Sequence, residues 1–295
     1  MKKSVTLNQG KTIYNMKFFG LKDLYDYLKS NPAINMSVFS TQASMKDNAA
    51  FSGEPLDTAI EYLLNGYTEG FDNFLEANKR LQTGISEYLE DYETKRSMFA
   101  GVPIAPLVAA NVPDCRLIIE PVHEIEIRNI YYNLSYPHTT SSSQIRNRGL
   151  ATLYMIQALE ARGVMVNFKA FDLSKCEQEI LNTSIDLKKP GEEALNIQKC
   201  YFPMVAKEFL RRILFRVMES SDVTEPDWGD GYGQSLTQKE CREFFNAKDH
   251  DIVISRPKDL GIKGENLYQD TLNMIESLNL EKEFDVKQLK KLSRN

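Results

Sequence analysis

The feature that most limits how this chain can fold is a strand–loop–helix–strand unit between residues 125 and 173. An alternating apolar run is followed by a hydroxyl-rich loop, a long amphipathic segment, Gly163 and a second alternating run. Two strands joined by a helix of this length almost always lie parallel, with a right-handed crossover. The unit therefore predicts an α/β protein with a mainly parallel sheet and flanking helices.

Apolar periodicity predicts further helices and short strands on both sides of this unit. Helices are expected at residues 21–29, 55–67, 70–98 with a break at Gly84, 142–162, 203–220 and 267–278. Strands are expected at residues 122–134, 164–171, 183–188 and 251–255. Residues 1–115 are predicted to be a helical N-terminal extension, and residues 116–295 to be the α/β domain.

Charge and cysteine usage exclude several classes of function. The chain has 36 basic and 41 acidic residues, so it lacks the basic field that is typical of nucleic-acid-binding proteins. The four cysteines are widely spaced, which disfavours zinc and dithiol chemistry and favours reduced thiols. No apolar run approaches the roughly 18 residues of a membrane span, and the first residues lack the apolar core of a signal peptide. We therefore expect a cytoplasmic protein that does not enter a membrane.

The loop after the first core strand is the sharpest candidate for a functional site. In α/β sheets, ligands bind beyond the carboxyl ends of the strands, which here means residues 133–144. Hydroxyl groups at such a place can complete the oxygen shell of a metal or hold an anion at a helix N-terminus. The alternative is structural, because serines are common helix N-caps. The hydroxyl-bearing and amide residues of the loop are Asn133, Ser135, Thr139, Thr140, Ser141, Ser142 and Ser143.

At this loop the chain resembles von Willebrand factor A-type domains, in which an Asp-x-Ser-x-Ser motif after the first strand binds magnesium. The corresponding residues here are Asn133-Leu134-Ser135-Tyr136-Pro137, so asparagine replaces the aspartate and proline replaces the second serine. The resemblance implies Asn133, Ser135 and Thr139 as metal ligands. Loss of the carboxylate weakens any magnesium site, because it removes the charge that compensates dehydration of the ion.

A second resemblance, to a family of uncharacterised bacteriophage and prophage proteins, extends over about the last two thirds of the chain. It depends on GVPIAPLVAANVP at 101–113, IRNRGLATLYMIQALEARG at 145–163, the helix at 202–220 and DIVIS at 251–255. This resemblance implies a von Willebrand A-like domain and a phage origin, with the host cytoplasm or the virion as its location. It implies no particular activity.

Candidate partner-binding residues lie at the start of the long helix and in an acidic, glycine-rich loop. Arginines on a helix can bind acidic groups, although they more often face solvent or pair with a neighbouring carboxylate. Trp228 next to Asp227 suits an interface anchor, and the alternative is that it folds back onto the core. The candidates are Ser141, Ser142, Arg146, Arg148, Asp227 and Trp228.

These patterns favour a non-enzymatic protein that docks a partner through its strand-end loops. The resemblance to von Willebrand A domains suggests an AAA+ ATPase of the MoxR kind as the partner, and the phage resemblance suggests a virion or assembly protein. One alternative is a metal-dependent hydrolytic enzyme that uses Ser135, Thr139 and Asp172. Another is a nucleic-acid-processing factor, for which the candidate arginines are Arg146, Arg148, Arg211 and Arg212.

Overall fold

A computed structural model gives the architecture of most of the chain. It describes residues 1–8, 10–31, 51–82, 92–98, 102–110, 112–121, 126–176, 179–192, 194–220, 234–284 and 286–294. The candidate residues Asp227 and Trp228 lie outside these ranges.

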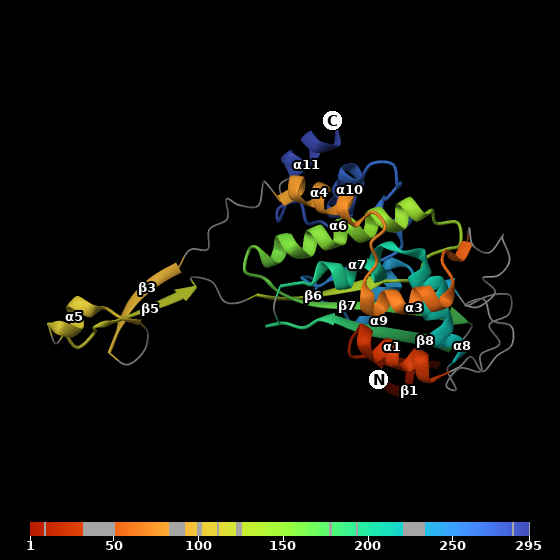
Figure 1. Cartoon of the computed structure of the whole chain (residues 1–295), viewed down its shortest axis with the longest axis horizontal. Helices are drawn as coiled ribbons and strands as arrows, with labels where there is room; N and C mark the ends of the chain where they lie inside the picture. The colour runs from red at the N-terminus through yellow and green to blue at the C-terminus, as the bar shows by residue number, and fades with distance from the viewer. Residues whose placement is uncertain are drawn as a thin grey trace.

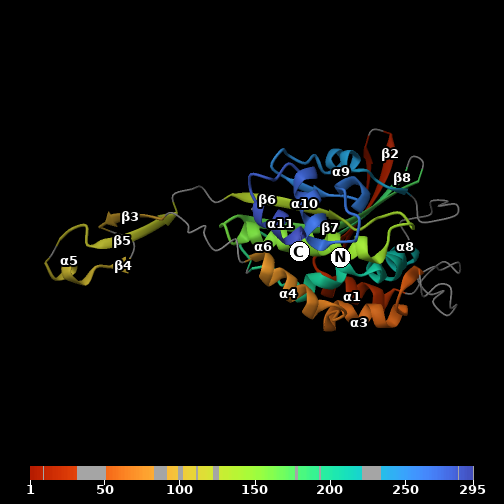
Figure 2. The same ribbon diagram turned by 90° about the horizontal axis from the view of Figure 1, so that it is seen from above.

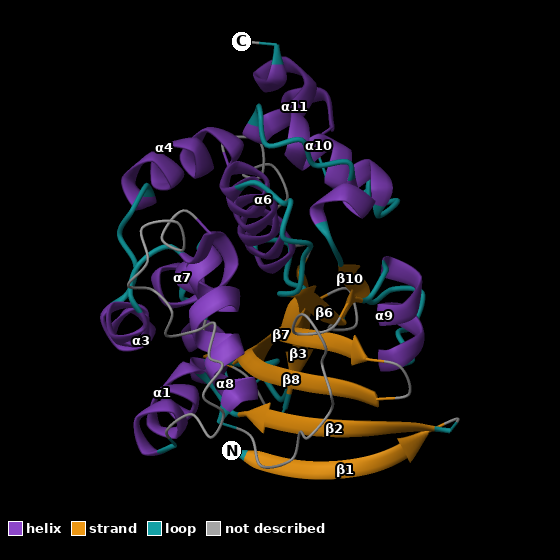
Figure 3. Cartoon of the chain, turned by 90° about the vertical axis from the view of Figure 1, so that its right-hand side faces the viewer, coloured by secondary structure: helices purple, strands orange, loops and turns teal. Residues whose placement is uncertain are grey.

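A large mixed sheet forms the centre of the molecule (Figures 1 and 3). Its strands follow the order β1-β2-β8-β7-β6-β10, and β9 pairs with the far end of β7. The pairs β2–β8, β6–β7 and β6–β10 are parallel, whereas β1–β2, β7–β8 and β7–β9 are antiparallel. The strands are β1 (Lys2–Asn8), β2 (Lys11–Phe18), β6 (Ile127–Asn133), β7 (Met165–Cys176), β8 (Glu179–Lys188), β9 (Gln234–Ser235) and β10 (Ile252–Ile254).

Most helices cover one face of this sheet, and α9 lies on the other (Figure 3). They are α1 (Leu21–Ser30), α3 (Leu56–Asn65), α4 (Phe71–Gln82), α6 (Ser142–Glu160), α7 (Ile197–Val205), α8 (Phe215–Glu219), α9 (Gln238–Phe245), α10 (Leu267–Ser277) and α11 (Val286–Ser293). The predicted α/β class and the parallel unit β6–α6–β7 are confirmed. The sheet also contains the antiparallel neighbours β7 and β8.

Alternation along the strands divides the apolar core between the two faces. Ile130 and Tyr132 of β6 belong to the large cluster under the helices, whereas Tyr131 packs into the smaller cluster beneath α9. The ring of Tyr131 stacks on Phe245 of α9 with centroids 4.6 Å apart. A single helix is therefore enough to cover the second face near β6, β7 and β10.

The central helix α6 begins and ends where its sequence signals predict. Ser141 is the N-cap and forms a capping box with Gln144, in which each side chain bonds to the backbone of the other residue. Gly163 adopts a left-handed φ of 79° after the last turn. Gly149 faces α7 so closely that a Cβ atom there would lie 2.3 Å from the carbonyl oxygen of Met204.

The helix predicted at residues 203–220 is interrupted near its start. Helix α7 ends at Val205, Ala206 is extended with φ −101° and ψ 127°, and a π-helix then occupies Phe209–Leu214. Two buried tyrosines supply hydrogen bonds to backbone carbonyl groups at this break. Tyr132 Oη donates to the carbonyl of Met204 at 3.0 Å, and Tyr136 Oη donates to that of Lys207 at 3.5 Å. Both tyrosines come from β6 and its following loop, so the break depends on tertiary contacts.

The N-terminal residues belong to the main sheet, which differs from the helical extension predicted for residues 1–115. Strand β2 pairs in parallel with β8, and its Met16 and Phe18 share one apolar cluster with Ile130 and Tyr132. Helices α1, α3 and α4 follow β2, so only part of the expected helical segment is observed. Because β2, α1, α3 and α4 contribute to the same core, these four elements are built into the α/β body.

A second, smaller sheet has the order β3-β5-β4 and is drawn apart from the main sheet in Figures 1 and 2. It contains β3 (Tyr92–Ser97), β4 (Val102–Pro103), helix α5 (Ala105–Ala109) and β5 (Arg116–Pro121). A strand therefore replaces the end of the helix that was predicted at residues 70–98. Within the described part of the chain, no helix is long and apolar enough to cross a membrane.

Candidate functional site

The parallel strands β6, β7 and β10 bring their carboxyl ends to one edge of the sheet. From β6 the chain passes through α6 to β7 on one side, while β10 flanks β6 on the other side. Such a reversal of strand order marks the crevice in which α/β proteins bind ligands. Polar residues lie at or beyond these strand ends. Asn133 is the last residue of β6, Asp172 and Ser174 lie in the last part of β7, Ser135 follows β6, and Ser255 and Arg256 follow β10.

The polar residues after β6 and β7 form a closed cluster. Asn133, Ser135 and Asp172 are at most 4% exposed. Ser135 N donates to Asn133 Oδ1 at 2.9 Å, and the Ser135 hydroxyl donates to the carboxylate of Asp172. The Asn133 amide nitrogen contacts Cys241 Sγ at 3.5 Å. Ser135 and Asp172, two residues of the enzymatic alternative, are therefore in contact, but a substrate cannot reach them in this conformation.

Burial raises the pKa of Asp172 to about 6, and the hydrogen bonds from Ser135 and Ser174 act in the opposite direction. Burying an ionised carboxylate lowers the stability of the folded state unless the group is protonated or paired with a partner. Such groups concentrate at functional sites, although structural networks also contain them.

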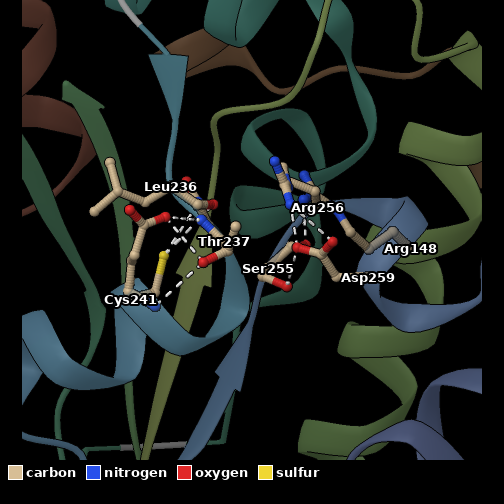
Figure 4. Close-up of polar contacts among 9 residues, drawn as sticks. Arg148, Leu236, Thr237, Cys241, Ser255, Arg256 and Asp259 are labelled. Carbon is tan, nitrogen blue, oxygen red and sulfur yellow. Dashed lines mark hydrogen bonds and ion pairs between the residues drawn. The ribbon is translucent and has the colours of Figure 1, made fainter. Parts of the chain in front are cut away.

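The first turn of α9 covers the Asn133 end of this cluster, where Cys241 contacts the Asn133 side chain. Figure 4 shows Thr237 and Cys241 in this part of the chain. Thr237 caps α9 and forms a capping box with Glu240, which fixes the start of the helix. Gln238 Nε2 donates to the carbonyl of Val253 at 2.7 Å and ties the helix to β10. Cys241 is fully buried, and burial raises the pKa of its thiol to about 12. The rim above β6 is thus occupied by the protein's own chain.

Arg148, which was predicted to contact a partner, is buried between the sheet and its loops. Its side chain is 1% exposed, and it donates to Tyr132 Oη at 3.1 Å and to the carbonyl of Ser255 at 2.8 Å. Its guanidinium also lies over the Tyr132 ring, 4.5 Å from the centroid. This arrangement links α6 to the end of β10 (Figure 4), so Arg148 holds the rim together and is not open to a partner.

Arg256, directly after β10, is held by its own helical turn. It makes a bidentate ion pair with Asp259, with both N–O distances 2.9 Å, and the Ser255 hydroxyl donates to the same carboxylate at 3.3 Å. The turn is a short 3-10 helix, Pro257–Leu260. The β10 end of the rim is therefore rigid and charge-balanced.

The open part of the site is the outer loop that leads from β6 into α6. Residues 137–139 and 141–143 are exposed, which includes the candidates Thr139, Ser141 and Ser142. Ser141 accepts a hydrogen bond from Gln144 N at 3.2 Å, and Gln144 donates to the carbonyl of Ile262 at 3.0 Å. The loop is consequently anchored at both ends while its middle faces solvent.

A pocket of about 390 Å³ lies beside this loop, between the two segments that flank α3, the first turns of α6 and the break after α7. Glu208 is 6% exposed and accepts from Glu54 N at 3.3 Å. Arg146 reaches Glu69 at 3.5 Å, and both side chains are substantially exposed. Sequence reasoning identified Arg146 but missed the pocket, because its walls come from four separate segments. Among the lining residues are Gly53, Tyr67, Glu69, Ser142, Arg146 and Glu208.

Arg211 and Arg212, the remaining nucleic-acid candidates, are at most 5% exposed. Arg211 donates to the carbonyls of Phe51 and His138, whereas Arg212 donates to those of Glu54 and Gly53. They fasten the segment before α3 to the π-helix. Neither guanidinium is placed to bind a phosphate.

The predicted magnesium ligands do not fit an ion in this conformation. Asn133 and Ser135 use their oxygens within the closed cluster, whereas Thr139 lies in the exposed loop. The cluster contains one carboxylate, Asp172, and the described residues hold no group of three or more His, Cys, Asp or Glu side chains that could bind a metal.

Comparison with known proteins gives one family. A family model described as Domain of unknown function (DUF7192) matches residues 3–282. No curated protein and no solved structure matches the chain.

Proposed function

This chain belongs to the DUF7192 family, and we propose that it is a von Willebrand A-like docking protein without catalytic activity. The proposed docking site is the rim surface, defined as residues 137–143 together with the pocket residues Glu69, Arg146 and Glu208. The partner is a protein segment that carries an acidic side chain. This segment would lie along the loop and place its acidic side chain at the start of α6, beside Arg146.

The observation that carries this proposal is the division of the strand-end residues into a sealed part and an open part. Asn133, Ser135 and Asp172 are buried and linked to one another through Ser135, so a substrate cannot reach them in this conformation. Residues 137–143, by contrast, present hydroxyl groups from a loop that is fixed at both ends. A rigid, exposed, polar loop beside a pocket suits recognition, because little conformational entropy is lost on binding.

The start of α6 favours a carboxylate at this surface. The N-terminal turn of a helix carries partial positive charge, and exposed serines there supply hydrogen-bond donors. Arg146 is 44% exposed, and its ion pair with Glu69 is long, at 3.5 Å. Exposed pairs of this kind contribute little free energy, so a partner's carboxylate can replace Glu69 at small cost.

Affinity purification with matched charge reversals tests this proposal. We expect wild type and Lys239→Glu, a control on the far helix α9, to retain one partner in near-equal molar amount, and Arg146→Glu to lose it. Mass spectrometry would identify the partner, for which MoxR-type ATPases and virion proteins are the first candidates. The proposal fails if the three proteins retain the same material, or if wild type retains none.

A further inference from the structure

Strand β1 forms one outer edge of the large sheet (Figure 3). Among the described strands it pairs only with β2, so one side of its backbone faces away from the sheet. Two apolar side chains on this strand are strongly exposed, Val5 at 57% and Leu7 at 78%. An extended edge with exposed apolar residues is a template for pairing with another strand.

We propose that β1 is the interface of a twofold dimer in which two copies join their large sheets edge to edge. The two β1 strands run antiparallel and are centred on Thr6. This register places Val5 of each copy opposite Leu7 of the other and Thr6 opposite Thr6. Val5 and Leu7 project from one face of the strand and Thr6 from the other. Apolar pairs and threonine pairs are both favourable cross-strand neighbours; the twofold axis repeats the Val5–Leu7 pair and passes through the Thr6 pair.

The positions of the lysines favour a second copy as the occupant. Lys2 and Lys3 lie before the paired segment 4–8, so neither faces its counterpart. In the proposed register the two Lys3 residues are six positions apart along the strands, which is roughly 20 Å at about 3.4 Å per residue. This separation exceeds the Debye length of about 8 Å at physiological salt, so their repulsion is screened.

The body of each protomer needs no rearrangement for this pairing. The described side chains of residues 2–7 are exposed or partly exposed, and none belongs to the buried core. The apolar residues that anchor the hairpin, Ile13, Met16 and Phe18, all belong to β2. A dimer built on five paired residues is small by the standard of stable interfaces, so we expect reversible, concentration-dependent association.

Sedimentation equilibrium on the full chain tests association, with Leu7→Lys as the disrupting variant. We expect wild type to dimerise and Leu7→Lys to dimerise about tenfold more weakly or worse, with an unchanged melting temperature because residue 7 is exposed. Val108→Lys, which alters an exposed residue of α5, is the matched control and should behave as wild type. A wild-type protein that stays monomeric at several hundred micromolar would overturn the proposal, and binding of an acidic extended peptide to β1 would then be the alternative.

Cysteine pairing tests the register itself in a Cys115→Ser background. Disulfides need Cβ atoms about 3.5–4.5 Å apart, a distance met only by directly opposite residues. In the proposed register, residue 5 of one copy lies diagonally to residue 5 of the other, and the same holds for residue 7. Val5→Cys alone and Leu7→Cys alone should therefore cross-link poorly. A mixture of the two variants should cross-link efficiently, because residue 5 then faces residue 7. Equal cross-linking of the separate and mixed samples would contradict the Thr6-centred register.

Discussion

Asp172 shows how much of the site could be predicted residue by residue. The sequence identifies Asn133 and Asp172 at the ends of two strands, and parallel pairing places Asn133 beside Phe171, the residue before Asp172. Their proximity was therefore predictable. The burial of Asn133 was not, because its cover includes Cys241 of α9, which carries no sequence signal linking it to β6. The same applies to Arg148, whose partner, the Ser255 carbonyl, lies more than 100 positions along the chain.

The buried Asp172 carboxyl should make stability depend on pH. Its pKa in the folded state, about 6, is above the usual 3.8. The folded protein therefore binds this proton more tightly than the unfolded chain, and the associated stability is present below pH 3.8 and lost as the pH rises through about 6. Asp172→Asn removes the charge and keeps an acceptor for Ser135, so we expect it to raise the free energy of unfolding at pH 7.5 by roughly 1–3 kcal/mol.

Urea unfolding of both proteins at pH 4 and pH 7.5 would measure this effect. The difference between wild type and Asp172→Asn should be small at pH 4 and large at pH 7.5. Ser174→Ala is a useful comparison, because it removes one of the hydrogen bonds that favour the ionised carboxylate and should therefore shift stability at pH 7.5 in the opposite direction. A pH-independent difference would mean that Asp172 is not the titrating group.

At the scale of elements, the sequence predicts the ends of a helix correctly where local interactions determine them. The capping box at Ser141 and the left-handed Gly163 delimit α6 within two residues of the prediction. The predicted helix at 203–220 is broken because Tyr132 and Tyr136 satisfy carbonyl groups near Ala206, a contact that periodicity cannot reveal. Strand β1 was missed for another reason. Its apolar alternation is limited to Val5 and Leu7, which are both exposed, and two residues are too few to distinguish a strand from a loop.

The first turn of α9 should control access to the cluster beneath it. Thr237→Ala removes a capping box, which typically costs about 1 kcal/mol of helix stability. Local opening would become about fivefold more frequent, so we expect Cys241 to react with a thiol reagent about fivefold faster. Ser141→Ala removes the equivalent capping box from α6 and should leave Cys241 labelling unchanged. Labelling rates resolved by mass spectrometry distinguish Cys241 from the other thiols, and equal rates in both variants would argue against this role of α9.

At the scale of the whole molecule, the large sheet is assembled from segments that are far apart in the sequence. Strand β2, near the N-terminus, pairs with β8 about 170 positions later, and its Met16 and Phe18 are fully buried. Long-range parallel pairing of this kind leaves no local sequence signal, because the intervening crossover can include any number of elements. This is why β2, α1, α3 and α4 were predicted as part of an appendage, although they share one apolar core with β6 and α6. Strands β3 and β4, by contrast, belong to the separate small sheet.

Truncation would test how far the N-terminal segment belongs to the core. Removing residues 1–8 deletes β1, whose described side chains are all at least partly exposed, so the melting temperature should fall by only a few degrees. Removing residues 1–18 also deletes Met16 and Phe18, and each buried apolar side chain of this size contributes roughly 2–5 kcal/mol. Because total stabilities are about 5–15 kcal/mol, we expect the shorter chain to lose cooperative unfolding in circular dichroism. A fragment of residues 116–295 lacks β2, α1, α3 and α4 altogether. If this fragment unfolds cooperatively, the predicted division into an N-terminal extension and a separate α/β domain would be correct after all.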